Sequence, residues 1–242
     1  MKSEFKKIAI ICASERELAP FLPLIENPTI SERAMLRIHE GRLNGFEVAA
    51  VYCGVCKVNA AAAAQIMIDC YGADTVISAG ASGGMAEDLQ LFDTVVAAEA
   101  CYHDVHERIL TDYHPFMKTQ FFPASSELVS AAKALKMPYH TGVVQCKDAF
   151  YGQHEPEAMP VGYELINKWE AWKKLGCLAS EMETAALYIV AAKLRVRVGA
   201  CFLVMANQER EKLGLENPVV HDTDMAVQVA VEAIRKLIKE ER

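Results

Sequence analysis

The sequence predicts an α/β fold in which helices cover both faces of a central mixed β-sheet, giving three layers (αβα) in one domain spanning residues 1–242. Short buried apolar runs of strand length alternate with amphipathic or alanine-rich runs of helix length. An Asn44–Gly45 pair between two strand-like runs adds one antiparallel hairpin. No repeat, low-complexity tract or Gly/Ser linker divides the 242 residues.

The apolar periodicity and the turn residues predict the order of the elements. The first half is expected to contain a strand at 8–13, a helix at 14–25, strands at 34–43 and 46–54, a helix at 58–72 and strands at 73–80 and 92–103. The second half is expected to contain a helix at 125–137, a strand at 139–150, a helix at 165–176, a strand at 177–181, a helix at 182–194, a strand at 197–207 and a final helix at 222–242. Ser14 and Glu17 have the spacing of a capping box, and Gly176 is placed to end a helix.

Composition narrows the class of protein. The net charge is −7, and acidic and basic residues are mixed along the chain, so no basic stripe is available for nucleic acid. The apolar run after the first lysines is only six residues long and acidic residues follow it, unlike a signal peptide, and no run reaches membrane-spanning length. We therefore expect a cytoplasmic protein with no nucleic acid or membrane partner.

Eight cysteines lie mostly in apolar, strand-like runs, as reduced and buried cysteines do. Cys53 and Cys56 form one CxxC motif, which is typical of redox centres and zinc sites. A second CxxC or an HxxxH that would complete a tetrahedral site is missing from the sequence, so no metal is expected. A redox or metal protein is the lowest-ranked of the alternatives.

Ligands of open α/β sheets collect at the carboxyl ends of the strands. Four short segments fall there: 79–85 (AGASGGM), 147–153 (KDAFYGQ), 180–184 (SEMET) and 205–209 (MANQE). The small residues of the first predict a loop that lets a ligand approach the backbone, although a tight turn explains them equally well. In the second, Phe150 either stacks on a flat ligand or packs in the core.

The Glu-Met-Glu of residues 181–183 lies where a strand gives way to a helix. Glutamate is unfavourable in a buried strand without a partner, so simple packing does not explain the pair. A change from strand to helix within three residues would send the two carboxylates to different tasks. A carboxylate in a pocket accepts hydrogen bonds from two hydroxyls, as a sugar diol requires.

Together these segments resemble the superfamily of nucleoside phosphorylases and nucleosidases, over essentially the whole chain. IAIICASEREL, ISAGASGGM and EACYHDV resemble the methylthioadenosine/S-adenosylhomocysteine nucleosidases, whereas KDAFYGQHE, CLASEMETAAL and VMANQEREKLG resemble uridine phosphorylase. EMExxA is the most specific motif. The resemblance implies a phosphorylase/hydrolase-like fold and an enzyme that cleaves the N-glycosidic bond of a nucleoside.

The resemblance also implies roles for individual residues. Glu183 and Met182 would hold the ribose, Phe150 would stack on the base, and Glu17 would activate water as general base. The expected catalytic residues are Glu17, Glu183 and Asn207, which would orient the leaving base. The expected substrate-binding residues are Gly80, Ala81, Ser82, Gly83, Phe150, Gln153, Glu181, Met182 and Glu183. No cofactor is expected, and phosphate would be a co-substrate only in a phosphorylase.

Three departures from the family pattern leave the reaction and the base open. Glu17 and a residue near Ser78 occupy positions where phosphorylases carry phosphate-binding arginines, which favours hydrolysis. Asn207 stands where purine-cleaving members have a proton-donating aspartate, and an amide delivers no proton. Gln153 matches the uracil-binding glutamine of uridine phosphorylase, but Glu155 replaces its companion arginine.

Hydrolysis is slightly preferred over phosphorolysis on this basis. Phosphorolysis remains an alternative, because Arg16 is adjacent to Glu17 and Arg33 or Arg37 could come from a neighbouring subunit. A nucleoside-binding protein without catalytic activity is a further alternative. The resemblance implies a homodimer or a homohexamer, since neighbouring subunits complete the sites of this family.

Overall fold

A computed structural model describes residues 6–102, 121–135, 139–150 and 155–241 of the chain. Within them, ten strands form one mixed sheet with the order β10-β6-β8-β9-β5-β1-β4-β3-β2, and β7 pairs with β6. The strands are β1 Lys7–Cys12, β2 Glu26–Arg33, β3 Leu36–Leu43, β4 Phe46–Tyr52, β5 Thr75–Gly84, β6 Thr94–Tyr102, β7 Phe121–Pro123, β8 His140–Cys146, β9 Cys177–Glu181 and β10 Arg197–Asn207. Since β10 also pairs with β5, the five strands β10, β6, β8, β9 and β5 form a closed ring.

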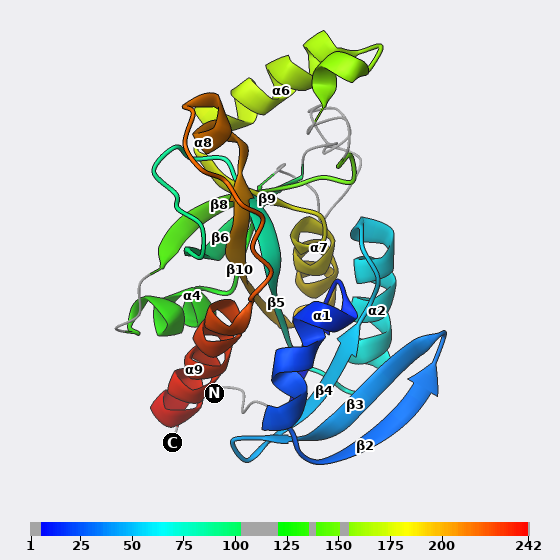
Figure 1. The fold of residues 1–242 in the computed structure, drawn as a ribbon. Helices are drawn as coiled ribbons and strands as arrows, with labels where there is room; N and C mark the ends of the chain where they lie inside the picture. Colours follow the sequence, from blue (N-terminus) through cyan, green and yellow to red (C-terminus); the bar gives the residue numbers. More distant parts are fainter. Residues whose placement is uncertain (1–5, 103–120, 136–138, 151–154, 242) are drawn as a thin grey trace.

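Helices cover both faces of this sheet, as predicted (Figure 1). The helices are α1 Glu15–Leu18, η1 Ala19–Leu24, α2 Lys57–Asp69, α4 Ser126–Lys133, η2 Pro156–Ala158, α6 Gly162–Lys174, α7 Thr184–Leu194, α8 Gln208–Lys212 and α9 Asp224–Glu241. Helices α2 and α7 bury their alanine-rich faces in one core, whereas α1, α4 and α9 pack in a second core on the other face. None of the helices in the described part of the chain has the length and apolar character to span a membrane.

Local sequence signals account for several elements. Asn44 and Gly45 have φ angles of 54° and 84° and join β3 to β4 in a two-residue hairpin, with Leu43 paired to Phe46. The predicted helix at 14–25 divides into α1 and the 3₁₀ helix η1, because Pro20 and Pro23 supply no N–H for α-helical hydrogen bonds. Strand β2 and helix α8 were not predicted.

The predicted small-residue loop at 79–85 is wrong, because β5 continues as a strand through Gly84. The end of β5 pairs in parallel with β10, where the last pair is Gly84 with Asn207. It also pairs with β9, where Gly83 is opposite Ser180. Glycine is required at the end of this strand because a Cβ on Gly84 would lie 2.7 Å from the Asn207 side chain. The backbone of this segment is thus held in ladders on both sides.

Candidate active site

A pocket of about 210 Å³ opens at the carboxyl ends of several strands. Its walls come from the β1–α1 turn, the end of β5, the residues after β8, the β9–α7 junction and the end of β10. Ala81, Ser82, Gly83, Phe150, Glu181, Met182, Glu183 and Glu17 line it, as do Lys147, Trp169 and Gln208. The fold therefore brings most of the sequence-predicted site residues into one cavity.

Glu17 has a local role and a pocket position at once. Its Oε2 accepts hydrogen bonds from Ser14 N (2.9 Å) and Ser14 Oγ (3.0 Å), which completes the capping box of α1. Its Oε1 accepts a hydrogen bond from Ala81 N at 2.8 Å, so the carboxylate also touches the end of β5. A carboxylate has about four acceptor positions, which leaves room for a further donor such as water.

The close approach of Glu17 explains why position 80 is a glycine. A Cβ on Gly80 would lie 2.4 Å from Glu17 Oε1, well inside contact distance. Gly80 therefore acts beside the pocket by admitting this carboxylate, and is not among the residues that line it. The Ser82 hydroxyl donates to Leu203 O at 3.1 Å and is tied to β10.

The two glutamates of the Glu-Met-Glu motif have separate tasks. Glu181 Oε2 accepts from Glu183 N at 2.8 Å and Thr184 N at 2.7 Å, so it caps the first turn of α7. Glu183 instead reaches across to α2, where its Oε1 accepts from Cys56 N at 2.7 Å. Met182 is half-buried in the pocket wall between them.

The environment of Glu183 disfavours the ionised form of its carboxyl group. Glu183 is only 8% exposed, and burial, followed by the neighbouring Glu181 carboxylate, raises its pKa from 4.5 to about 8. The hydrogen bond from the N–H of Cys56, the residue just before α2, opposes this rise. A buried carboxyl with a perturbed pKa in a pocket is typical of a functional site.

The CxxC motif belongs to the turn that holds Glu183. Cys56 precedes α2 with a φ angle of 84°, which presents its N–H to the carboxylate. Both Cys53 and Cys56 are free thiols, and burial raises the pKa of Cys53 to about 12. Among the described residues, no group of three or more His, Cys, Asp and Glu side chains is arranged to hold a metal ion.

An aromatic and cationic wall lies on the side of the pocket formed after β8. Phe150 is 46% exposed at the pocket, and Lys147 is buried with its Nζ 5.2 Å from the ring centroid of Trp169. Trp169 comes from α6, which the sequence identified only as an amphipathic helix. The two tryptophans of this helix, at 169 and 172, could have indicated a buried face, since both are buried and Trp169 lines the pocket.

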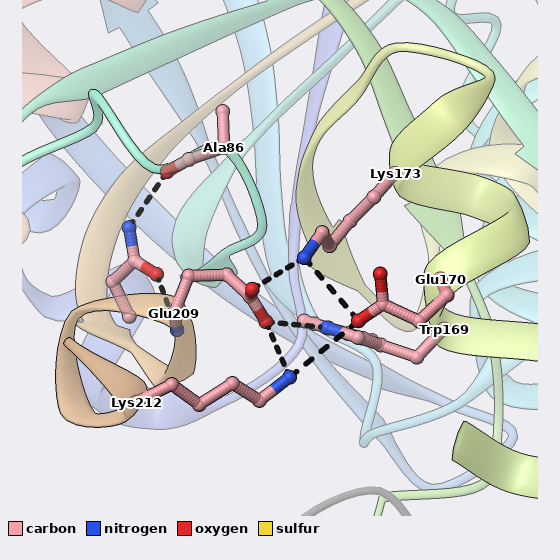
Figure 2. Close-up of polar contacts among 7 residues, drawn as sticks. Ala86, Trp169, Glu170, Lys173, Glu209 and Lys212 are labelled. Carbon is pink, nitrogen blue, oxygen red and sulfur yellow. Dashed lines mark hydrogen bonds and ion pairs between the residues drawn. The ribbon is translucent and has the colours of Figure 1, made fainter. Parts of the chain in front are cut away.

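A charged cluster of Glu209, Lys173 and Lys212 holds Trp169 in place (Figure 2). Trp169 Nε1 donates to Glu209 Oε1 at 2.8 Å, and Lys173 and Lys212 form ion pairs with the same carboxylate. Burial works to raise the pKa of Glu209, but the hydrogen bonds from Lys173, Lys212 and Trp169 outweigh it and lower the pKa. The cluster joins α6 to α8 and holds the indole ring in the pocket wall.

Asn207 lies outside the pocket in which its expected role would place it. It is fully buried and does not line the pocket. Its Nδ2 donates to Ala86 O (2.9 Å) and Leu89 O (3.0 Å), and its Oδ1 accepts from Glu209 N at 3.0 Å as the N-cap of α8. Both amide protons are therefore used within the protein, and this geometry gives Asn207 a structural role in place of contact with a leaving group.

The other predicted residues are placed as follows. Gln153 lies outside the described residues. Ser78 is buried, and Arg33 and Arg37 are exposed on β2 and β3. No arginine is among the described residues that line the pocket, where the cation is Lys147.

Comparison with known proteins identifies relatives of this chain. A family model described as phosphorylase superfamily matches residues 7–240. Uridine phosphorylase of Treponema pallidum (strain Nichols) is 46% identical over 172 residues, which cover 70% of this chain and 66%, just under two thirds, of that protein. The 5′-methylthioadenosine/S-adenosylhomocysteine nucleosidase of Maridesulfovibrio salexigens is 31% identical over 189 residues, covering 75% of this chain and 77% of the relative.

Solved structures show the same fold. The 5′-methylthioadenosine/S-adenosylhomocysteine nucleosidase of Colwellia psychrerythraea in complex with adenine superimposes with a TM-score of 0.74 at 25% identity, covering 98% of this chain and 96% of that one. The S. pneumoniae nucleosidase with a transition-state inhibitor gives a TM-score of 0.77 at 24% identity, with 96% and 99% coverage. From its sequence and its fold, the chain belongs to the phosphorylase superfamily.

Proposed function

We propose that this protein cleaves the N-glycosidic bond of a nucleoside by hydrolysis and releases the free base. The observation that carries the proposal is the arrangement of two carboxylates in one pocket, Glu183 anchored on α2 and Glu17 anchored on β5. Family membership supports the reaction type.

In this proposal Glu183 binds the ribose hydroxyls, with Met182 beneath the sugar. Cleavage passes through a transition state with positive charge on the sugar, and a fixed carboxylate nearby stabilises that charge. Ribose hydroxyls that donate to Glu183 favour its ionised form, so substrate binding lowers the raised pKa. Phe150 forms the aromatic contact to the base, and the end of β5 contacts the sugar or the attacking group.

Glu17 is the proposed general base. Its carboxylate lies in the pocket wall beside Ala81. In this proposal it accepts a proton from a water molecule that attacks the sugar. Phosphate is normally bound by arginine, and the described lining of the pocket contains none. The reaction as proposed needs no cofactor.

Phosphorolysis is the second candidate, because the 46% identical relative is a uridine phosphorylase. Phosphate would then be the co-substrate, and arginines such as Arg33 or Arg37 of a neighbouring subunit would bind it. This assembly would be a homodimer or a homohexamer. We also propose that the protein works in the cytoplasm, which the eight free cysteines support.

The test is release of free base from uridine, inosine, adenosine and methylthioadenosine, with and without phosphate, together with identification of the sugar product. Free ribose, or its 5′-thio derivative, at a rate indifferent to phosphate supports hydrolysis. Formation of ribose 1-phosphate, with strict dependence on phosphate, would show that the reaction is phosphorolysis and not hydrolysis. No base release from any substrate, with tight nucleoside binding retained, would reject catalysis.

A pair of variants tests the role of the Glu17 carboxylate. Glu17→Gln should lower kcat of a hydrolase at least about 100-fold while leaving substrate affinity similar, because general-base catalysis contributes on this scale. Glu15→Gln, an exposed neighbour on the same helix, is the matched control and should retain activity. Equal activity of Glu17→Gln and Glu15→Gln would remove Glu17 from the mechanism.

A further inference from the structure

Lys147 is a buried lysine in the wall of the pocket. It is 4% exposed, and its backbone N donates to Glu181 O at 3.0 Å, which joins it to the start of the Glu-Met-Glu motif. Its Nζ lies over the Trp169 ring at 5.2 Å. Within the described part of the chain, this Nζ has no hydrogen-bond or ion-pair partner.

A second buried lysine shows what is unusual about Lys147. Lys57 is 5% exposed, also lies over an aromatic ring, and forms an ion pair with Asp148 at 3.1 Å. Among the described residues, the Lys147 ammonium has the ring contact alone, and burial lowers its pKa from 10.5 to about 7. Burying an ammonium without an acceptor is costly, so the position is better explained by a ligand that supplies the acceptor.

The order of the strands places Lys147 on the opposite side of the site from Glu17. Lys147 follows β8 and Glu17 follows β1, with β9 and β5 between these two strands. Glu183, the proposed ribose ligand, follows β9 in the middle. A nucleophile activated at Glu17 and a base leaving near Lys147 would therefore lie on opposite sides of the sugar, as a displacement at its anomeric carbon requires.

We propose that Lys147 donates a hydrogen bond to the carbonyl oxygen at position 4 of a pyrimidine base or position 6 of a purine base, and thereby selects nucleosides with an oxo group there, such as uridine and inosine. An ammonium group only donates hydrogen bonds, so it pairs with O4 of uracil or O6 of hypoxanthine but opposes the amino group that cytosine and adenine carry at the same ring position. The inference rests on the proposed cleavage of a nucleoside and names its substrate class.

The same contact assists the reaction. As the bond from the anomeric carbon to the base nitrogen breaks, its electron pair stays on the base. The oxygen of water, which gives a proton to Glu17, or the oxygen of phosphate forms the new bond to the sugar, and the released base anion takes up a proton from solvent. The negative charge of an oxo-substituted base spreads onto its carbonyl oxygens, where the ammonium stabilises it. The Glu209 cluster fixes Trp169, and Trp169 in turn positions Lys147.

The experiment compares kcat/KM for uridine with cytidine and for inosine with adenosine, in the wild type and in Lys147→Met. We expect the wild type to favour the oxo member of each pair, and the variant to lose about 10- to 100-fold on the oxo substrates and much less on the amino substrates, as for a charged hydrogen bond. Lys57→Met is the control for a buried lysine and should keep the wild-type selectivity.

Three outcomes would overturn the inference: a wild type that prefers amino bases, an unchanged selectivity in Lys147→Met, or a variant in which only the KM for phosphate rises. If the wild type cleaves no nucleoside, the proposed function fails separately. Calorimetric binding of free uracil, hypoxanthine and adenine then still tests Lys147, with weaker binding of the first two expected in Lys147→Met. Equal affinities in the two proteins would reject it.

Discussion

Replacing Glu183 by Gln should stabilise the fold while it abolishes turnover. The carboxyl has a pKa of about 8 in the folded protein against 4.5 for the unperturbed group. Because the folded pKa is raised, its contribution to stability is fully present below pH 4.5 and is lost as the pH rises to about 8. The glutamine of the variant does not titrate, and its side-chain oxygen can still accept the hydrogen bond from Cys56 N.

The size of the effect follows from the shift of about 3.5 pH units, at about 1.4 kcal/mol per unit. The free energy of unfolding of Glu183→Gln should exceed that of the wild type by a margin that widens by about 3 kcal/mol between pH 4.5 and 7. The widening should reach about 5 kcal/mol near pH 8 and then stop. Turnover should fall at least about 100-fold, because an amide lacks the charge that stabilises the transition state.

The measurement is urea unfolding of both proteins at pH 5, 7 and 8.5, at one protein concentration, with nucleoside cleavage assayed in parallel. Glu47→Gln, an exposed change on β4, should keep the wild-type pH dependence and activity. A margin that does not change with pH would refute the reasoning, because it would mean that Glu183 is ionised in the folded protein throughout. Retained turnover would remove Glu183 from the ribose site.

Three further changes test other parts of the site. Gly80→Ala places a methyl group 2.4 Å from Glu17 Oε1 and should lower kcat at least about 10-fold by displacing that carboxylate, whereas unchanged kinetics would show that Glu17 need not stay there. Asn207→Ala removes hydrogen bonds to Ala86, Leu89 and Glu209 and should cost about 2–4 kcal/mol in urea unfolding; a stable protein that has lost only kcat would restore a role in leaving-group chemistry. Trp169→Phe loses the hydrogen bond to Glu209 and should raise the KM for nucleoside about 10-fold with a smaller change in kcat, and an unaltered KM would mean that the ring needs no such anchor.

The sequence by itself determined the features that depend on neighbours along the chain. The Asn44–Gly45 turn, the Ser14–Glu17 capping box and the strand-to-helix change in residues 181–183 were all predicted, and the structure confirms each of them. The order of strands and helices followed from apolar periodicity, since the period of side-chain burial differs between the two. The resemblance carried by EMExxA supplied the family.

The tertiary structure decided everything that depends on contacts between distant segments. Small residues at 79–85 predicted a loop, but β10 and β9 offer hydrogen-bonding edges on both sides and extend the strand through Gly84. Asn207 was expected in the pocket, but Ala86 and Leu89, more than a hundred residues away, take its amide protons. In the sequence Lys147 is only one member of the charged pair Lys147-Asp148. In the fold it is buried, and its ammonium lies over the Trp169 ring. Burial and partnership are set by which segments meet, and these determine whether a polar side chain is structural or free to act on a ligand.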